Sequence, residues 1–339
     1  METTRQKSIW KSFLHHDNTP MLLVLLGIII AITLIEGFVV RGGDFSEIAF
    51  IKGSNIANVL VQVSITGIMA IGMTVVMISG GMDLSCGQMV SLAGSFLAYL
   101  LVNKDLPSVS AILLTILLCI IFQVAMGAMI AYTKLEPFIV SLGFMSVYEG
   151  VAYLITQGRE ITIGNQIDGF NQTLIKFGNT NGSFYLGMAM LIFLLCVVII
   201  WILLSYTKYG RWIYSVGGNE EAAYLAGISV KQFKIVLYGI NGFFVALASI
   251  ILLSRVGAGS PIMGSGKEID VIAAVVVGGT ALSGGKGNMW GTVIGVVLLG
   301  CITNAMNILG ISPYYQYIMR GLLILLSIFI GNVGGRRKN

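Results

Sequence analysis

The sequence predicts an all-α integral membrane protein with about ten transmembrane helices. Hydrophobic residues make up 56% of the 339 positions and charged residues only 10%, and the mean hydropathy is +0.90. A soluble domain needs many more polar residues to cover its surface. Long apolar runs recur along the whole chain, so we expect a single transmembrane domain over residues 1–339.

The apolar runs give the expected positions of the spans, because a helix needs roughly 17–25 mostly apolar residues to cross a bilayer. The first run follows a tail with Arg5, Lys7 and Lys11, but no small-residue cleavage pattern comes after it. We interpret it as a retained span rather than a signal peptide. The ten expected spans begin near Pro20, Ile56, Gly87, Ser108, Pro137, Tyr185, Gln232, Ile269, Trp290 and Pro313.

The distribution of basic residues predicts the orientation. With a cytoplasmic N-terminus, twelve of the 20 Lys and Arg residues fall in inside segments and seven in outside segments, as the positive-inside rule requires. We therefore expect both termini in the cytoplasm, a cytoplasmic tail over 1–19, a cytoplasmic coupling loop over 207–231 and an outer loop over 157–184. The outer loop is either a cover over the outer mouth or a solvated connector.

Several other classes of function are excluded or disfavoured. The net charge of +5 comes from bases scattered among short loops, whereas a nucleic-acid surface needs them clustered on one face. His15 and His16 have too few further ligands nearby for a metal site, and we expect no cofactor. The cysteines are widely spaced and read as packing residues. They are Cys86, Cys119, Cys196 and Cys301.

A glycine-rich stretch, "TALSGGKG", looks like a phosphate-binding loop but lacks its required residues. Thr280 stands where a glycine is needed, and Gly287 follows Lys286 where Ser or Thr would ligate magnesium. We therefore expect no ATP hydrolysis by this chain itself. No set of nucleophile, base and orienting residue can be assembled either, which disfavours a membrane enzyme.

The same stretch belongs to a repeated pattern. "GGMDLSCG" from Gly80 and "GGTALSGG" from Gly278 share GGxxLSxG. Glycine-interrupted segments of this kind are typical of duplicated transporters, in which broken helices border a cavity. Chance is the alternative to internal duplication, because the flanking similarity is low and the predicted orientation places both turns on the cytoplasmic side rather than in inverted positions.

Ionisable residues within apolar runs indicate a pathway or a partner. Asp83 can cap the helix that follows it, and Asp270 complements the dipole at the start of a span. Glu149 has no basic partner nearby in sequence, and we expect it to line water. Asn304 and Asn307 share a helix face; their amides suit a neutral polyhydroxyl solute, with bonding between helices as the alternative. Glu36 and Arg320 are the other ionisable residues of this kind.

The stretch "GGNEEAAYLAGI" predicts a short helix in the cytoplasmic loop. A flexible glycine pair precedes Asn219, which is a good N-cap, and two acids in the first turn favour the helix dipole. Gly227 suits the C-terminal stop. Such a helix either lies on the membrane or docks onto a partner. The residues concerned are Gly217, Gly218, Asn219, Glu220, Glu221, Ala222, Ala223 and Gly227.

The chain resembles the ribose-type monosaccharide permeases, the membrane subunits of bacterial ATP-binding cassette (ABC) sugar importers within the branched-chain amino acid/ribose permease superfamily. The resemblance runs from about Asn55 to Ile330. It rests on the blocks "GMTVVMISGGMDLSCGQMVSLAG", "EPFIVSLGFMSVYEGVAYLIT", "TKYGRWIYSVGGNEEAAYLAGI", "KEIDVIAAVVVGGTALSGGKGNMWGTVIG" and "NILGISPYYQYIMRGLLILL". By this resemblance, residues 217–227 contact an ATPase subunit, and Asp83, Ser85, Glu268 and Asp270 match recurrent family positions.

The resemblance implies a non-catalytic permease of the bacterial inner membrane. Its partners would be an ATP-binding cassette ATPase, an extracytoplasmic sugar-binding protein and a second permease copy, identical or similar. Glu149 stands where many relatives have Arg, and Lys267 where an aromatic residue is common, which leaves the sugar open. The alternative is an ion-coupled secondary carrier that uses the intramembrane acids. The candidate residues of the substrate path are Asp83, Ser85, Glu149, Asp270, Asn304 and Asn307.

Overall fold

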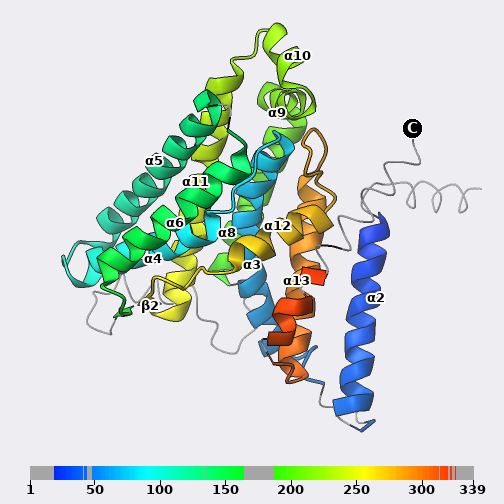
Figure 1. Ribbon diagram of the computed structural model, residues 1–339. Helices are drawn as coiled ribbons and strands as arrows, with labels where there is room; N and C mark the ends of the chain where they lie inside the picture. Colours follow the sequence, from blue (N-terminus) through cyan, green and yellow to red (C-terminus); the bar gives the residue numbers. More distant parts are fainter. Residues whose placement is uncertain are drawn as a thin grey trace, which may run out of the picture.

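A computed structural model describes residues 19–40, 42–43, 48–133, 135–163, 187–312, 314–319, 321–322 and 325. Within them the chain is almost entirely helical, as Figure 1 shows. Its elements are α2 (Thr19–Ile35), η1 (Glu36–Val40), α3 (Gly53–Ile78), α4 (Cys86–Val102), α5 (Ser108–Thr133), α6 (Pro137–Thr156), β1 (Ile161–Thr162), α8 (Met188–Tyr206), α9 (Lys208–Gly218), α10 (Glu220–Leu225), α11 (Val230–Val256), β2 (Ala258–Gly259), α12 (Lys267–Val277) and α13 (Met289–Ile308).

Seven helices in the described part of the chain are long and apolar enough to cross a membrane, which confirms the all-α membrane class. They are α2 (extended through η1), α3, α5, α6, α8, α11 and α13. α4 is apolar but has only 17 residues. The tail over 1–18, most of the outer loop and most of the span expected from Pro313 lie outside the described residues.

The span expected from Ile269 is a short helix instead. α12 has 11 residues, which at 1.5 Å per residue cover roughly 16 Å, about half of a hydrocarbon core. It ends because Gly278 and Gly279 follow Val277, and Gly279 adopts a positive φ of 85° that closes the turn. α12 therefore covers only about half of the depth of the bundle, and the chain reverses through a turn over residues 278–288 before α13 begins.

The core surrounds α3, which packs against α8, α11, α12 and α13. α11 runs alongside α5 as well as α3. Small residues allow close contact: a β-carbon on Gly67 would lie 2.4 Å from the Phe193 ring, and one on Gly72 would lie 3.1 Å from the Cα of Asn241. Glycine at such contacts is what close helix packing in lipid requires.

The loops gather at two ends of the bundle. β1 and β2 pair antiparallel beyond the C-terminal end of α11, whereas α10 precedes its N-terminal end and projects beyond its neighbours (Figure 1). The 27 residues of α11 separate these ends by roughly 40 Å. Both turns of the GGxxLSxG pattern lie toward the α10 end, where their backbones meet the end of α9. The expectation that they share one side is confirmed.

Candidate docking loop and transport pocket

The short helix expected in the loop over 207–231 is α10. Asn219 is its N-cap, and its side-chain oxygen accepts the backbone N–H of Ala222 at 2.9 Å. Glu220 and Glu221 occupy the first turn, where acids are favourable. Gly227 follows the helix with a positive φ of 87°. The predicted cap, first-turn acids and glycine stop are all confirmed.

The glycine pair before α10 differs from the expectation of a flexible hinge. Gly217 and Gly218 are the last two residues of α9. A β-carbon at Gly217 would lie 1.8 Å from the carbonyl oxygen of Ile78 and 2.7 Å from the amide nitrogen of Gly285, whereas one at Gly218 would meet nothing within 4 Å. Gly217 is therefore a close-packing residue, and the chain bends at the extended Asn219.

Three segments meet at a contact that we name the glycine junction: residues 78–80, Gly217 and residues 284–287. The amide of Gly285 donates to the carbonyl of Ile78 at 2.8 Å, and a β-carbon on Gly284 would lie 2.8 Å from the Cα of Gly80. These contacts join the end of α3, the end of α9 and the turn between α12 and α13 through backbone atoms. The two repeated turns are therefore packed on each other.

A side chain of α9 adds a second link to the junction. The hydroxyl of Tyr214 donates to the carbonyl of Gly287 at 2.8 Å. Partial burial raises the pKa of this hydroxyl above its ordinary value, because the charged phenolate is poorly solvated there. It therefore stays protonated and remains a donor across the physiological pH range. α9 thus holds the turn before α13 at Gly285 and again at Gly287.

α10 exposes large apolar side chains in a polar segment. Tyr224 is 69% and Leu225 79% exposed, although the helix is anchored on its other face, where Ala223 packs in a cluster with Val216 and Ile228. Glu220 pairs with Lys234 of α11. A groove lies between α10, the start of α11 and the turn from α5 to α6. Exposed apolar groups beside such a groove are typical of an interaction surface.

Asp83 lies in a buried polar network. One carboxylate oxygen accepts the amide N–H of Ser85 at 2.8 Å and also the Ser85 hydroxyl. The other accepts the side-chain amides of Gln123 at 2.8 Å and Asn241 at 2.7 Å. Asp83 therefore ties the start of α4 to α5 and α11. It is not itself the N-cap, because it lies two residues before Ser85, which is the N-cap residue and makes no side-chain capping bond.

The asparagines on α13 do not share a single role. Asn304 and Asn55 of α3 exchange side-chain hydrogen bonds of 2.8 and 2.9 Å. This is the bonding between helices that stood as the alternative to sugar binding. Asn307 is exposed and accepts from the side chain of Gln316 at 2.8 Å. Both amides thus serve contacts within the chain.

The remaining acids lie in different surroundings. Glu36 is buried, and its two carboxylate oxygens accept the backbone amides of Ala49 at 2.6 Å and Phe50 at 2.9 Å, which fixes the turn after η1. Glu149 is half-exposed on α6. Arg320 lies outside the described residues. The structure therefore does not bring the sequence-predicted acids together in one site.

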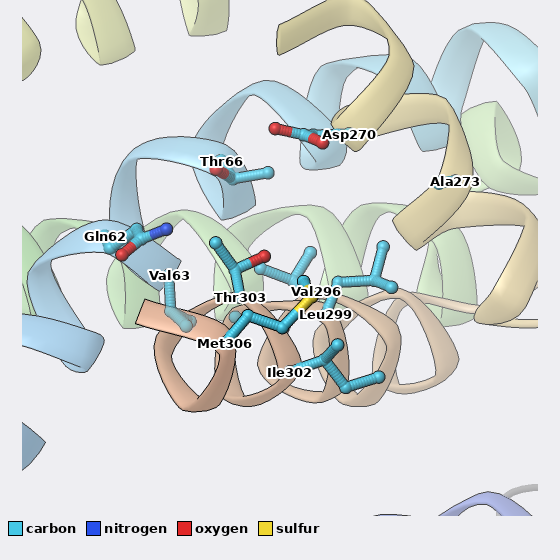
Figure 2. A pocket seen from close by; sticks show the side chains of 11 residues that line it. Gln62, Val63, Thr66, Asp270, Ala273, Val296, Leu299, Ile302, Thr303 and Met306 are labelled. Carbon is cyan, nitrogen blue, oxygen red and sulfur yellow. The ribbon is translucent and has the colours of Figure 1, made fainter. Parts of the chain in front are cut away.

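Asp270 lines a pocket between α3, α12 and α13. Figure 2 shows Gln62 and Thr66 from α3, Asp270 from α12 and Thr303 from α13 around the same hollow. The rest of the wall is apolar. Asp270 lies in the first turn of α12, as expected. The other three residues were not predicted from the sequence, although Gln62 and Thr66 are four apart in an apolar run and so share a helix face.

A bundle of spanning helices, a projecting helix and a pocket with a few polar side chains in an apolar wall are typical of a membrane transport protein. A family model described as the permease component of branched-chain amino acid transport systems matches residues 55–328, so the chain belongs to this family. No solved structure matches the chain.

Several curated proteins are similar over most of their length. The ribose import permease of Haemophilus influenzae is 38% identical over 85% of this chain and 88% of its own, and that of Bacillus subtilis is 39% identical over 83% and 86%. The xylose transport system permease of Escherichia coli is 31% identical over 93% and 92%. The chain is thus a permease subunit of an ATP-binding cassette importer and a multi-pass protein of the bacterial inner membrane.

Proposed function

We propose that this permease imports a neutral monosaccharide, and that a separate ATPase subunit drives it through α10. The similar permeases are named for ribose and xylose, which supports a monosaccharide as substrate. An extracytoplasmic binding protein delivers the sugar, and two copies of the permease enclose the path. In this arrangement both termini and α10 face the cytoplasm, and about ten segments enter the membrane.

The observation that carries the proposal is the continuous chain of contacts from α10 to the pocket. α10 is fixed to α9 by the packing of Ala223 in the cluster with Val216. α9 in turn contacts the turn over 278–288 at Gly285 and Gly287. That turn follows directly on α12, which carries Asp270. A displacement of α10 by an ATPase is thereby passed to a wall of the pocket.

The ATPase-coupling stretch over residues 217–227 has two functional parts. Tyr224 and Leu225 project outward and supply the apolar contact with the ATPase, while Glu221 is exposed beside them. Gly217, at the other end, faces the glycine junction. The partner thus contacts one end of the loop, and the loop contacts the transport helices at its other end.

The intramembrane residues also have two kinds of role, contact with the sugar and contact between helices. Asp270 borders the transported sugar. Asp83 and Ser85 hold the wall formed by α4, α5 and α11 in shape, and the amide of Asn304 does the same for α3 and α13. Asn307 and Glu149 are more exposed, and we assign them to the path or to the surface that the second permease copy covers.

The proposal is tested by site-specific crosslinking from Glu221→Cys in membranes that also contain the ATPase subunit. Because the native cysteines are buried, the introduced thiol dominates the reaction. We expect a crosslink that changes with ATP. Glu160→Cys, an exposed position at the opposite end of the bundle, is the matched control and should give none.

Two results would contradict this mechanism, and the second would favour its rival, the ion-coupled secondary carrier. If no position from Asn219 to Gly227 crosslinks while both proteins are present, docking at α10 is wrong. If purified permease in liposomes accumulates D-ribose on a proton or sodium gradient alone, the chain is a secondary carrier.

A further inference from the structure

We propose that the pocket between α3, α12 and α13 is a subsite for the hydroxyl groups of the transported sugar, formed by Gln62, Thr66, Asp270 and Thr303. This inference rests on the proposed function and deepens it, because it assigns substrate contacts to particular side chains. Three of these residues carry no role in the mechanism described so far.

The depth of the pocket argues against a surface feature. Thr66 lies thirteen residues after the start of α3 and twelve before its end, which is roughly 18–20 Å from either end. The pocket is therefore near the middle of a spanning helix. Polar and charged side chains at this depth are costly against lipid and instead face a bundle interior or a water-filled space. Thr66 and Asp270 are both only partly exposed, as expected at a transport path.

The lining has the chemistry that a neutral sugar requires. The carboxylate of Asp270 accepts hydrogen bonds from two neighbouring hydroxyls, the Gln62 amide donates and accepts, and each threonine hydroxyl does either. Val63, Val296 and Leu299 supply part of the apolar lining between these polar groups. A few placed polar groups in an otherwise apolar wall are typical of small-molecule sites.

The charges of the lining distinguish a sugar from an amino acid. The family model is described by branched-chain amino acids, and a zwitterion needs a positive group for its carboxylate. Among the described residues that line this pocket, none is Lys or Arg, and the one ionisable residue is Asp270. An uncharged polyhydroxyl compound therefore fits better than an amino acid, because the described lining offers no cation for the carboxylate of an amino acid.

The position of Asp270 also connects sugar binding in the pocket with the ATP-driven movement of α9 and α10. α12 carries Asp270 in its first turn and leads into the turn held by α9. Gln62 and Thr66 belong to α3, whose far end is also in the glycine junction. A shift at the junction therefore changes the separation between the two sides of the pocket. Sugar bound between them is held in one state and released in the other.

The test measures uptake of D-ribose, D-xylose and L-leucine into proteoliposomes that contain the permease, the ATPase subunit and the binding protein. Asp270→Asn should lower kcat/KM for the transported sugar roughly 10- to 100-fold, the loss typical of a charged hydrogen-bond acceptor. Thr66→Val and Thr303→Val should each lower it about 2- to 10-fold. Thr115→Val is the matched control, because its hydroxyl bonds a carbonyl of its own helix.

The outcomes separate the subsite from the function. If the wild type imports a sugar and all three variants do so at its rate, the subsite is wrong and the proposed function stands. If the wild type imports leucine and neither sugar, both fail. Copurification with the ATPase subunit checks that each variant still assembles.

A second measurement covers the case in which Asp270→Asn does not assemble. Thr303→Cys, in a chain whose four native cysteines are replaced by alanine, is labelled with a small thiol reagent with and without D-ribose. Protection by ribose, but not by leucine, is the expected result. Equal labelling rates in all three conditions would contradict the subsite.

Discussion

Asp83 and Asp270 are both acids in the membrane-embedded bundle, yet their surroundings are opposite. Asp83 is fully buried, and its two oxygens accept four hydrogen bonds from Ser85, Gln123 and Asn241. Asp270 is only half-buried and borders a pocket. A fully buried acid that accepts four hydrogen bonds from its own chain fixes helices in place, whereas a partly exposed acid that lines a cavity also faces the space that a solute can enter. Being an acid inside a membrane protein does not by itself indicate a substrate contact.

The largest effect that this comparison predicts is on stability. Asp83→Ala should lower the free energy of unfolding by about 3–5 kcal/mol, because each buried donor left without an acceptor costs roughly 1–3 kcal/mol. Denaturant titration of the detergent-purified protein measures this. The same substitution at Asp270 is the control and should cost clearly less. Equal losses at the two positions would remove the distinction between them.

A second prediction concerns the junction that connects the two regions, since the turn with Asp83 and the turn after α12 meet there. Gly217→Ala places a methyl group 1.8 Å from a backbone oxygen, so backbone must move. We expect a loss of about 1–3 kcal/mol and weaker coupling between ATP hydrolysis and sugar uptake, measured as ATP consumed per sugar imported.

The neighbouring glycine supplies the control for this variant. Gly218→Ala adds a methyl group in open space at the end of α9, where alanine favours the helix by up to about 1 kcal/mol. It should leave coupling at the wild-type ratio. If the two alanine variants consume the same amount of ATP per imported sugar, the proposal that the glycine junction transmits the motion is wrong.

A smaller effect is expected from the uncharged pair between α3 and α13. The reciprocal bonds of Asn55 and Asn304 provide a neutral counterpart to the Asp83 network. A double-mutant cycle to alanine should give a coupling energy of about 0.6–1.7 kcal/mol, the range for hydrogen bonds between membrane helices. A coupling near zero would mean that each amide finds another partner when its own is removed.

The smallest effect is predicted outside the membrane core. Lys234→Ala removes the ion pair with Glu220, whose side chain is 53% exposed. Water and salt screen such a pair, so the cost should be about 1 kcal/mol or less. Thermal unfolding at low and high salt measures it, and the difference between lysine and alanine should shrink as salt rises. A loss as large as that of Asp83→Ala would show that α10 is held mainly by charge.

Local features of this protein were predictable from its sequence, and contacts between distant segments were not. α10 follows from Asn219, two acids and a glycine within a few residues. The partners of Asp83 come from 40 and 158 positions away, in apolar helices whose pattern does not mark an inward face. The packing of Gly217 depends on two other loops, and a glycine pair alone reads equally well as a flexible hinge.

The length of α12 shows where pattern reading fails. Its apolar run fits a full span, but the run includes Gly278 and Gly279, and the positive φ of Gly279 ends the helix at 11 residues. The same shortness brings the first turn of α12 to the level of the α3 centre, where Asp270 meets the pocket. The pocket residues on α3 and α13 could be proposed only once this depth was known.

The packing of Ala223 in the cluster with Val216 and Ile228 joins α9 and α10 into one bent unit. In the proposed function the ATPase contacts the end exposed at Leu225, and the other end, at Gly217, packs on backbone atoms, which have no rotamers to absorb a displacement. We expect such a contact to pass on small displacements with little rearrangement of side chains. It also leaves few routes for compensation, because a misfit between main chains cannot be relieved by repacking side chains.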